Sequence, residues 1–359
     1  MNLSSQQSKK LAQNAERFVQ NSESFSLLGI PGVGISVFLK NITFKSAQYI
    51  YVDIFSLPKP SEKLLFEHLY MQLGGTRQGG LYECQKILSE VTKSKKVVIC
   101  FGGFDQLHLE FKKNIFKSLK ALRAVNRENI VFIFGICKRI ESLIPEDAID
   151  IDLSMFANTL YIKPYPKEDL LALHEMYGPT RDINNSDLEK YLGLSGGHFQ
   201  LFQLLLQAEK VTGSSTDPYI KVSLSTIYSH LSYLQKSIVK KIVSNTFNNE
   251  PDSYLIETGL ITKVGDKYRT FSPLFDEFVL SQKFTKLPKK EAALLKILKT
   301  NKNKVVSKDD IFIAVWGIES TNASDWALDA LIYRLRRNNA FKTKGYTIEN
   351  HKKLGYRLI

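Results

Sequence analysis

Five short apolar segments that alternate with stretches of helical period constrain the fold more than any other feature of this chain. They are Phe25–Gly29, Tyr49–Phe55 and the runs KVVICF, NIVFIFGI and TLYIKPY. A strand buried on both faces is a continuous apolar run, and parallel strands need helical crossovers between them. The alternation therefore predicts an α/β fold, in which helices cover both faces of a parallel sheet.

The first apolar segment leads into a glycine-rich loop, GIPGVGIS. Gly29 and Gly34 lie five positions apart, Gly32 lies between them and Ser36 follows, which is the spacing of a phosphate-binding loop. Such a loop surrounds phosphates with backbone N–H groups at the start of a helix, and its lysine neutralises the β- and γ-phosphates. Ile35 stands at the position of that lysine. The sequence thus predicts a P-loop NTPase-like fold without its principal cation.

The third apolar run lacks the acidic residues that a nucleotide site needs to hold Mg²⁺ and to orient water. KVVICFGGFDQL resembles the corresponding strand of AAA+ ATPases, and more closely that of the STAND branch of signalling ATPases. In that family two acidic residues end the strand, and here Gly102 and Gly103 occupy their positions. Asp105 and Leu107 agree with the later part of the family pattern. The pair Gly102–Gly103 also suits a tight turn at the strand exit.

The segment SGGHF is similar to the lid motif of the same family, in which a glycine near a proline packs on adenine. Gly196, Gly197 and His198 match the motif, whereas Phe199 replaces the proline. His198 is either a phosphate ligand or a residue that packs the lid, and packing is the favoured interpretation.

Together these departures predict a pseudo-ATPase with no catalytic residue, no metal and no required cofactor. A vestigial site without ligand is the favoured interpretation. ATP or ADP binding without hydrolysis is the alternative, and its expected residues are Gly29, Gly32, Gly34, Ser36 and His198.

The 359 residues, 43% of them hydrophobic, are enough for several cores. The pattern predicts a core over residues 1–166, a helical lid over 167–218, a first winged helix over 219–283 and a second over 284–359. YLIETGLITKVGDKYRTFSPLFDEFV resembles the winged helix that follows the ATPase core in STAND proteins and archaeal replication initiators. Its mixed charges favour a structural or protein-contact role.

Positive charge is concentrated at the C-terminus. Residues 284–359 contain 16 Lys and Arg against 7 Asp and Glu, and so carry +9 of the net charge of +13. This indicates an anionic partner for that region. No apolar run reaches the roughly 18 residues of a transmembrane helix, so no membrane association is expected. Three cysteines without metal-ligand spacing fit a reduced, cytoplasmic compartment.

The last 73 or so residues resemble the OmpR/PhoB class of winged-helix DNA-binding domains over their whole length. LPKKEAALLKIL is similar to the opening strand and first helix, VVSKDDIFIAVWG to the second helix, LDALIYRLRR to the recognition helix and YTIENHKKLGYRLI to the hairpin wing. Ser307 and Ser324 are expected N-caps. Leu331 departs from the family, which often has a polar residue there. The predicted buried stripe of the recognition helix is Leu328, Leu331, Ile332 and Leu335.

The resemblance implies double-stranded DNA as a partner. Arg334 is the expected base contact in the major groove and Arg336 the expected phosphate contact, while Lys352 matches a basic residue at the wing tip. Lys353–Leu354 replaces a glycine-containing wing turn, which alters the expected sequence preference. The full set of expected DNA contacts is Tyr333, Arg334, Arg336, Arg337, Lys352, Lys353 and Arg357.

The predicted function is that of a transcriptional regulator or DNA-recruitment factor whose degenerate core acts as a scaffold or sensor. Two alternatives stay open: a nucleotide-gated switch, and an interaction subunit of a defence, replication or mobile-element complex. In the resembled family the loop equivalent to GIESTNAS contacts RNA polymerase, so this enzyme, or a neighbour-encoded effector protein, is a further expected partner. A dimer or higher oligomer would place two winged helices on repeated half-sites.

Overall fold

The computed structural model describes residues 6–76, 78–108, 110, 115–144, 152–177, 185–207, 217–282, 289–317, 324–337, 346–351 and 354–359. The chain divides into two compact units. Unit 1 comprises Met1–His230 and Lys241–Val279, and unit 2 comprises Leu231–Lys240 and Leu280–Ile359. The finer division into four domains stays a prediction. None of the described helices is long and apolar enough to span a bilayer.

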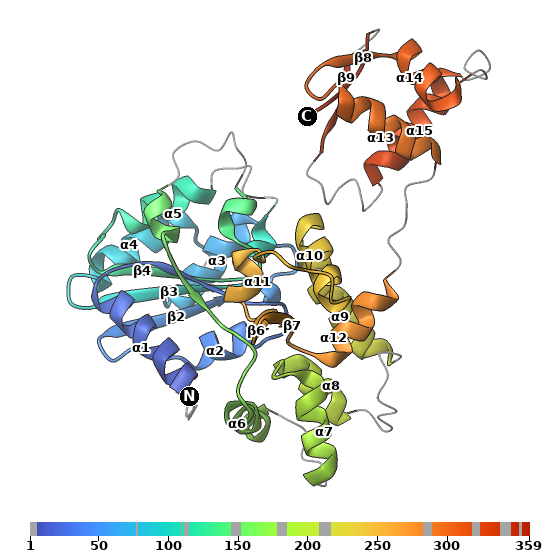
Figure 1. Ribbon diagram of the computed structural model, residues 1–359. Coiled ribbons are helices and arrows are strands. Elements are labelled where there is room, and N and C mark those ends of the chain that lie inside the picture. Colours follow the sequence, from blue (N-terminus) through green and yellow to red (C-terminus); the bar gives the residue numbers. More distant parts are fainter. Residues whose placement is uncertain are drawn as a thin grey trace. The chain divides into compact units, whose positions relative to one another are not determined.

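A five-stranded parallel sheet forms the centre of unit 1, with the strand order β2-β3-β4-β1-β5. Its strands are β1 (Phe25–Leu28), β2 (Ala47–Asp53), β3 (Lys96–Gly102), β4 (Ile130–Ile136) and β5 (Asn158–Tyr161). All residues of β1 and β4 are buried, because helices α3, α4 and α5 lie on one side of the sheet and α1 and α2 on the other (Figure 1). The parallel sheet covered on both faces, predicted from the sequence, is confirmed.

The covering helices are α1 (Gln6–Gln20), α2 (Ile35–Asn41), α3 (Glu62–Gln72), α4 (Leu81–Val91) and α5 (Ile115–Arg123). The hydroxyl of Ser61 caps α3 by accepting the N–H of Leu64 at 3.4 Å. Between the sheet and the helices lies a buried cluster of aromatic rings, whose closest centroids, those of Phe134 and Phe156, are 4.6 Å apart. Such rings bury large apolar areas and contribute much of a core's stability.

The strand order places the glycine loop at the carboxyl edge of the sheet. β1 pairs with β4 on one side and β5 on the other, so the loop between β1 and α2 opens beside the ends of both strands. The end of β3 is also near, since Gly102 is in register with Gly135 of β4. Ligands of open α/β sheets bind at this edge.

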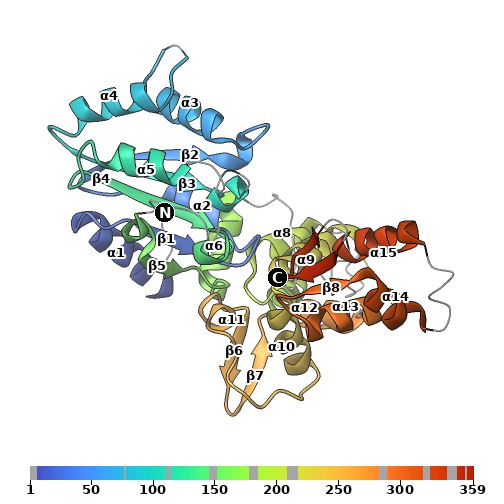
Figure 2. The ribbon, with the colours of Figure 1, turned by 90° about the horizontal axis from the view of Figure 1, so that it is seen from above.

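The rest of unit 1 is mainly helical. Its lid helices are α6 (Lys167–Tyr177), α7 (Asn185–Ser195) and α8 (Phe199–Gln207). The next elements are α9 (Pro218–His230), α10 (Tyr233–Val243), which crosses the boundary between the units, α11 (Ser253–Glu257), β6 (Ile261–Val264), β7 (Lys267–Thr270) and α12 (Pro273–Ser281). The antiparallel pair β6–β7 forms a hairpin that turns at Gly265 and Asp266 (Figure 2).

The C-terminal part of unit 2 is a winged helix. Its elements are α13 (Lys289–Thr300), β8 (Val305–Ser307), α14 (Lys308–Trp316), α15 (Asp325–Arg337), β9 (Ile348–His351) and β10 (Gly355–Leu358), and its antiparallel sheet has the order β8-β10-β9. The predicted stripe of α15 is buried, and Leu331, 2% exposed, belongs to the core. Ser307 and Ser324 accept backbone N–H groups as the predicted N-caps. The strand expected before α13 lies outside the described residues.

Candidate functional site

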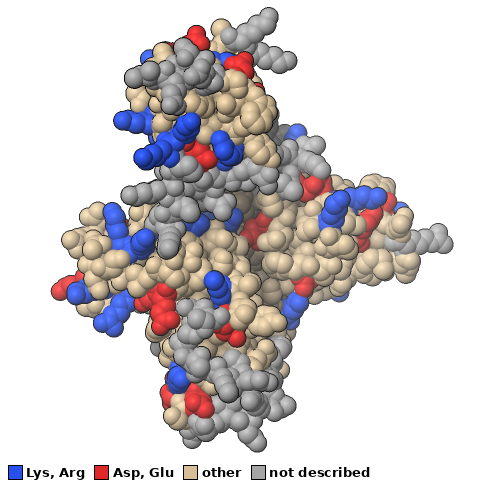
Figure 3. Space-filling model, turned by 90° about the vertical axis from the view of Figure 1, so that its right-hand side faces the viewer, with Lys and Arg blue, Asp and Glu red and all other residues tan. Residues whose placement is uncertain are grey.

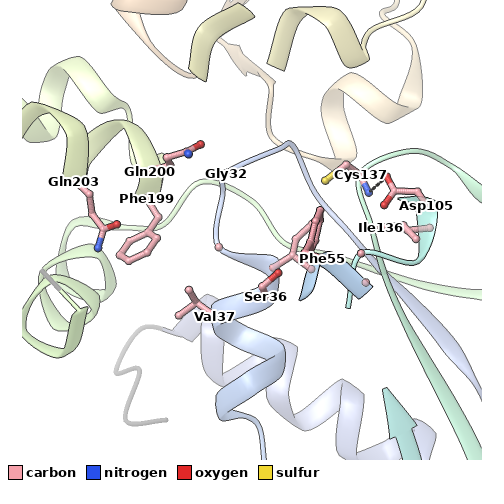
Figure 4. Close-up of a pocket in the computed structure, with 14 residues that line it drawn as sticks. Gly32, Ser36, Val37, Phe55, Asp105, Ile136, Cys137, Phe199, Gln200 and Gln203 are labelled. Atoms are coloured by element: carbon pink, nitrogen blue, oxygen red, sulfur yellow. Dashed lines mark hydrogen bonds between the residues drawn. The ribbon is translucent and has the colours of Figure 1, made fainter. Parts of the chain in front are cut away.

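A cavity of about 270 Å³ opens beside the glycine loop (Figure 4). Gly32, Gly34, Ile35 and Ser36 form one wall, and side chains of α8, including Phe199, form another. Its volume lies just below the roughly 300–1,000 Å³ of common small-molecule pockets. Among the described residues that line it there is no lysine, arginine or histidine. A phosphate placed there would therefore meet no cationic side chain from the described lining.

Two aromatic side chains occupy the space beside the glycine pair at the end of β3. A Cβ atom on Gly102 would overlap the hydroxyl of Tyr51 and lie 2.7 Å from its Cζ. A Cβ atom on Gly103 would lie 2.7 Å from Cδ2 of Phe55, and Gly103 has a φ of +74°, which favours glycine. The rings as placed leave room only for glycine, and an acidic side chain at either position would require Tyr51 or the 57% exposed Phe55 to move.

Asp105 connects the ends of β3 and β4. Its side chain is 6% exposed, and Oδ2 accepts the N–H of Cys137 at 3.1 Å (Figure 4). Oδ1 has no hydrogen-bond partner in the described part of the chain. Burial raises the pKa of this carboxyl. The hydroxyl of Tyr254 donates to the carbonyl of Cys137 at 2.7 Å. Asp105 thus adds a carboxyl to the cavity lining, and a carboxyl does not attract phosphate.

His198 connects the lid to the glycine loop through a hydrogen bond. The ring is fully buried, its Nε2 donates to the carbonyl of Pro31 at 2.8 Å, and its Nδ1 accepts the N–H of Leu201 at 3.2 Å. This pair of bonds requires the neutral Nε2–H tautomer. The N–H of Gln200 donates to the carbonyl of Gly32 at 3.1 Å. The structure therefore places His198 between lid and loop, and two consecutive loop carbonyls are bound by the start of α8.

Acidification is expected to destabilise unit 1 through His198. Burial lowers the pKa of its ring to about 4, whereas an unfolded histidine has a pKa near 6.5. Between these values the unfolded chain binds a proton that the folded chain excludes, so the free energy of unfolding falls as the pH falls. We expect a loss of about 1.5 kcal/mol between pH 6.5 and pH 5. Urea unfolding at a series of pH values measures it.

The matched variants are His198→Gln and a substitution of the exposed His108, His108→Gln. The first should remove most of the slope over this pH range and the second should retain it. An unchanged slope in His198→Gln would assign the acid sensitivity to other groups.

The exposed side of α15 carries the first group of predicted DNA contacts. Arg334 is exposed and makes no hydrogen bond or ion pair within the described ranges, and Tyr333 is 58% exposed. Arg336 is also exposed, but its Nη2 donates to the carbonyl of Ile348 at 2.6 Å. Arg336 therefore links α15 to strand β9 of the wing by a hydrogen bond. Its predicted contact with DNA phosphate would be additional to this bond.

The wing carries the second group. The guanidinium of Arg357 is paired with Glu349 on the neighbouring strand, with Nε at 3.0 Å from Oε2, so part of its charge is neutralised inside the wing. Lys352 and Lys353 lie outside the described residues. For Arg337 the position in α15 is described and the side chain is not. Figure 3 shows Lys and Arg side chains gathered on one side of unit 2.

Trp326 belongs to the same face of α15 and was missed from the sequence. It lies in the first turn of the helix and is 80% exposed. Its position seven residues before Tyr333, which is close to two helical turns, was the available signal. Two neighbouring acids of α15 have partners: Asp325 accepts Lys308 Nζ at 2.7 Å, and Asp329 accepts the hydroxyl of Tyr356.

The described residues contain no cluster of three or more His, Cys, Asp or Glu side chains that could hold a metal ion. The sites of interest are thus the glycine-loop cavity of unit 1 and the exposed face of α15 with the wing in unit 2.

Comparison with known proteins agrees with this division. Residues 282–358 match the family profile described as "Transcriptional regulatory protein, C terminal". This confirms the OmpR/PhoB-type winged helix that was predicted for the C-terminus, and with it a transcription-regulator DNA-binding domain. A comparison with curated proteins finds no match.

Among solved structures, the chain is similar to a Walker-type ATPase of Pyrococcus abyssi, at 13% identity, with 76% of this chain and 95% of that chain covered and a TM-score of 0.49. It is also similar to the ORC2 protein of Aeropyrum pernix, at 12% identity, with 78% and 95% covered and a TM-score of 0.46. A STAND protein of Pyrococcus horikoshii with a tetratricopeptide repeat sensor is 14% identical, with 96% and 53% covered and a TM-score of 0.35.

Proposed function

We propose that the chain is a DNA-binding regulator of the cytoplasm, in which α15 enters the major groove of duplex DNA and the wing contacts the backbone. Unit 1 serves as a scaffold or sensor without ATP hydrolysis. The DNA-binding part of the proposal draws on the matched family profile and on the basic charge of residues 284–359.

Arg334 is the observation that carries the proposal. It is exposed on the helix that a winged helix inserts into the groove, and no described residue neutralises it. Arg336 and Arg357, by contrast, are already bonded to Ile348 and Glu349. An arginine free to bind two acceptors at once suits the O6 and N7 atoms of guanine. Arg334 is therefore the side chain that we expect to recognise a base.

Replacing Arg334 with Ala is expected to weaken binding to the preferred site by roughly 1–3 kcal/mol and to relax specificity at one base pair. Fluorescence anisotropy with the full chain and a duplex selected from a random pool measures this change. Arg127→Ala removes the same charge from an exposed position of unit 1 and should leave affinity near that of the parent protein. Equal affinities for the two variants would contradict the assignment of Arg334.

The scaffold role of unit 1 is supported by two features of the site. Ile35 stands where the loop's lysine is expected, and the rings of Tyr51 and Phe55 occupy the space beside Gly102 and Gly103. Phosphoryl transfer depends on electrostatic stabilisation of developing charge, which the described lining does not provide.

A nucleotide-gated switch is the second candidate, favoured by the cavity itself, since Gly32, Gly34 and Ser36 line it. Calorimetric titration of the full chain with ATP and ADP, with and without Mg²⁺, separates the two roles. We expect no binding at millimolar nucleotide. Binding at micromolar concentrations would favour the switch, and an ADP complex as tight as the ATP complex would further exclude a role for the γ-phosphate.

A further inference from the structure

Trp326 is a large apolar side chain in an unusual environment. It is 80% exposed, and it has no ring or cation contact with any described residue. The other tryptophan, Trp316, packs against the core of unit 2, with Lys290 Nζ 5.4 Å from its ring centroid. Single exposed apolar side chains are common on protein surfaces, so Trp326 is informative only together with the residues beside it on α15.

Trp326 and Tyr333 form one ridge on α15. Successive helical residues turn by about 100°, so residues seven apart lie almost on the same line. That line is opposite the buried stripe that contains Leu331 and Leu335. Ala330 lies between the two aromatic residues, and its small side chain leaves both rings as the protruding features.

The positive charge beside this ridge indicates which kind of partner it contacts. Arg334 and Arg336 are exposed on either side of it, and the whole segment 284–359 is strongly basic. A duplex provides phosphates for such flanks, and the major groove provides one apolar group, the C5-methyl of thymine, which side chains recognise by apolar contact. Residues near the N-terminus of a recognition helix, where Trp326 lies, contact base edges.

We propose that Trp326 and Tyr333 are specificity-determining residues that contact thymine methyl groups in the major groove. The inference rests on the proposed DNA-binding function and extends it to a class of bases. Seven residues span about 10 Å of helix, which corresponds to about three base pairs at 3.4 Å each. The preferred site therefore contains two thymines about three base pairs apart, beside the guanine recognised by Arg334.

Single substitution of thymine by deoxyuridine tests the contacts, because it removes only the methyl group. With the full chain and a duplex selected from a random pool, loss of one contacted methyl should weaken binding about three- to fivefold, the effect of one buried methyl. Two such positions should emerge, about three base pairs apart. Trp326→Ala should abolish the effect at one of them and Tyr333→Ala at the other. Tyr219→Ala, at a 73% exposed tyrosine of unit 1, should retain both.

Fluorescence provides an independent readout. In a Trp316→Phe background Trp326 is the sole tryptophan, and the selected duplex should shift its emission and protect it from acrylamide. If the duplex binds but the emission, the deoxyuridine series and the Trp326→Ala affinity are all unchanged, the inference is wrong while the DNA-binding function stands. If emission responds to RNA polymerase and not to DNA, the ridge is a protein contact and the inference is equally wrong. If no duplex is enriched, the proposed function itself fails.

Discussion

Gly355→Ala is expected to abolish DNA binding while unit 1 stays folded. Gly355 begins β10, the central strand of the wing sheet, and is in register with Ser307 on one side and His351 on the other. Its φ of +147° is rarely adopted by residues with a side chain, and a Cβ atom would overlap the carbonyl oxygen of Val306. The added methyl group must therefore separate β10 from β8.

The displacement would disrupt the core, because β10 contributes the buried side chains of Tyr356 and Leu358. We expect the free energy of unfolding of unit 2 to fall by at least about 3 kcal/mol, the range of severe core and backbone changes. Both tryptophans lie in unit 2, so tryptophan fluorescence during urea unfolding reports that unit, and anisotropy reports DNA binding.

Gly317→Ala is the matched control in the same unit. Gly317 also has a positive φ, of +61°, but a Cβ atom there would have no neighbour within 4 Å. This variant should lose only the backbone preference of glycine for a positive φ, roughly 1–3 kcal/mol, and should still bind DNA. If both variants bind DNA with the same affinity, the packing of β10 on β8 is not required for the interface.

Much of the fold follows from local sequence patterns. The apolar runs predict the five parallel strands because a strand buried on both faces has no polar positions. Ser61, Ser307 and Ser324 predict helix starts because their hydroxyls accept backbone N–H groups, as the structure confirms. The buried stripe of α15 follows from its period. Each of these features depends on residues that are near one another in the sequence.

The candidate sites depend on contacts between distant residues, and these could not be predicted. Gly102 and Gly103 suggest only missing carboxylates until Tyr51 and Phe55 are seen to fill the space. The helical period places Arg334 and Arg336 on opposite flanks of the exposed side of α15, but it does not show that only Arg336 donates to a carbonyl of the wing. Likewise, nothing near His198 in the sequence indicates that its ring bonds to Pro31, 167 residues away.

The departures from the ATPase pattern fit together as one packing arrangement. Without acidic residues at the end of β3, the rings of Tyr51 and Phe55 can approach the glycine backbone. In the lid, His198 and Gln200 bond to the loop carbonyls of Pro31 and Gly32, and Phe199 stands at the position of the expected proline. We therefore expect Ile35→Lys alone to leave nucleotide affinity low, since the changes at the end of β3 and in the lid persist.

Gly196→Ala is expected to destabilise unit 1 by at least about 3 kcal/mol, a size typical of severe steric conflict in a packed interior. Gly196 follows α7 with a φ of +57°, and a Cβ atom there would overlap the carbonyl oxygen of Phe271. A Cβ atom on the neighbouring Gly197, which has a φ of +84°, would lie 2.3 Å from the carbonyl oxygen of Tyr165. The glycine pair thus lies where three backbone segments meet, so local packing alone accounts for the two glycines.

Gly193→Ala separates this steric effect from a general effect of glycine replacement. Gly193 lies inside α7, and a Cβ atom there would have no neighbour within 4 Å. Because alanine favours a helix interior over glycine by roughly 0.5–1 kcal/mol, this variant should be slightly more stable than the parent protein. Urea unfolding followed by far-ultraviolet circular dichroism measures both. If Gly196→Ala were as stable as Gly193→Ala, the lid would not pack against Phe271, and a nucleotide-binding role for the SGGHF segment would regain support.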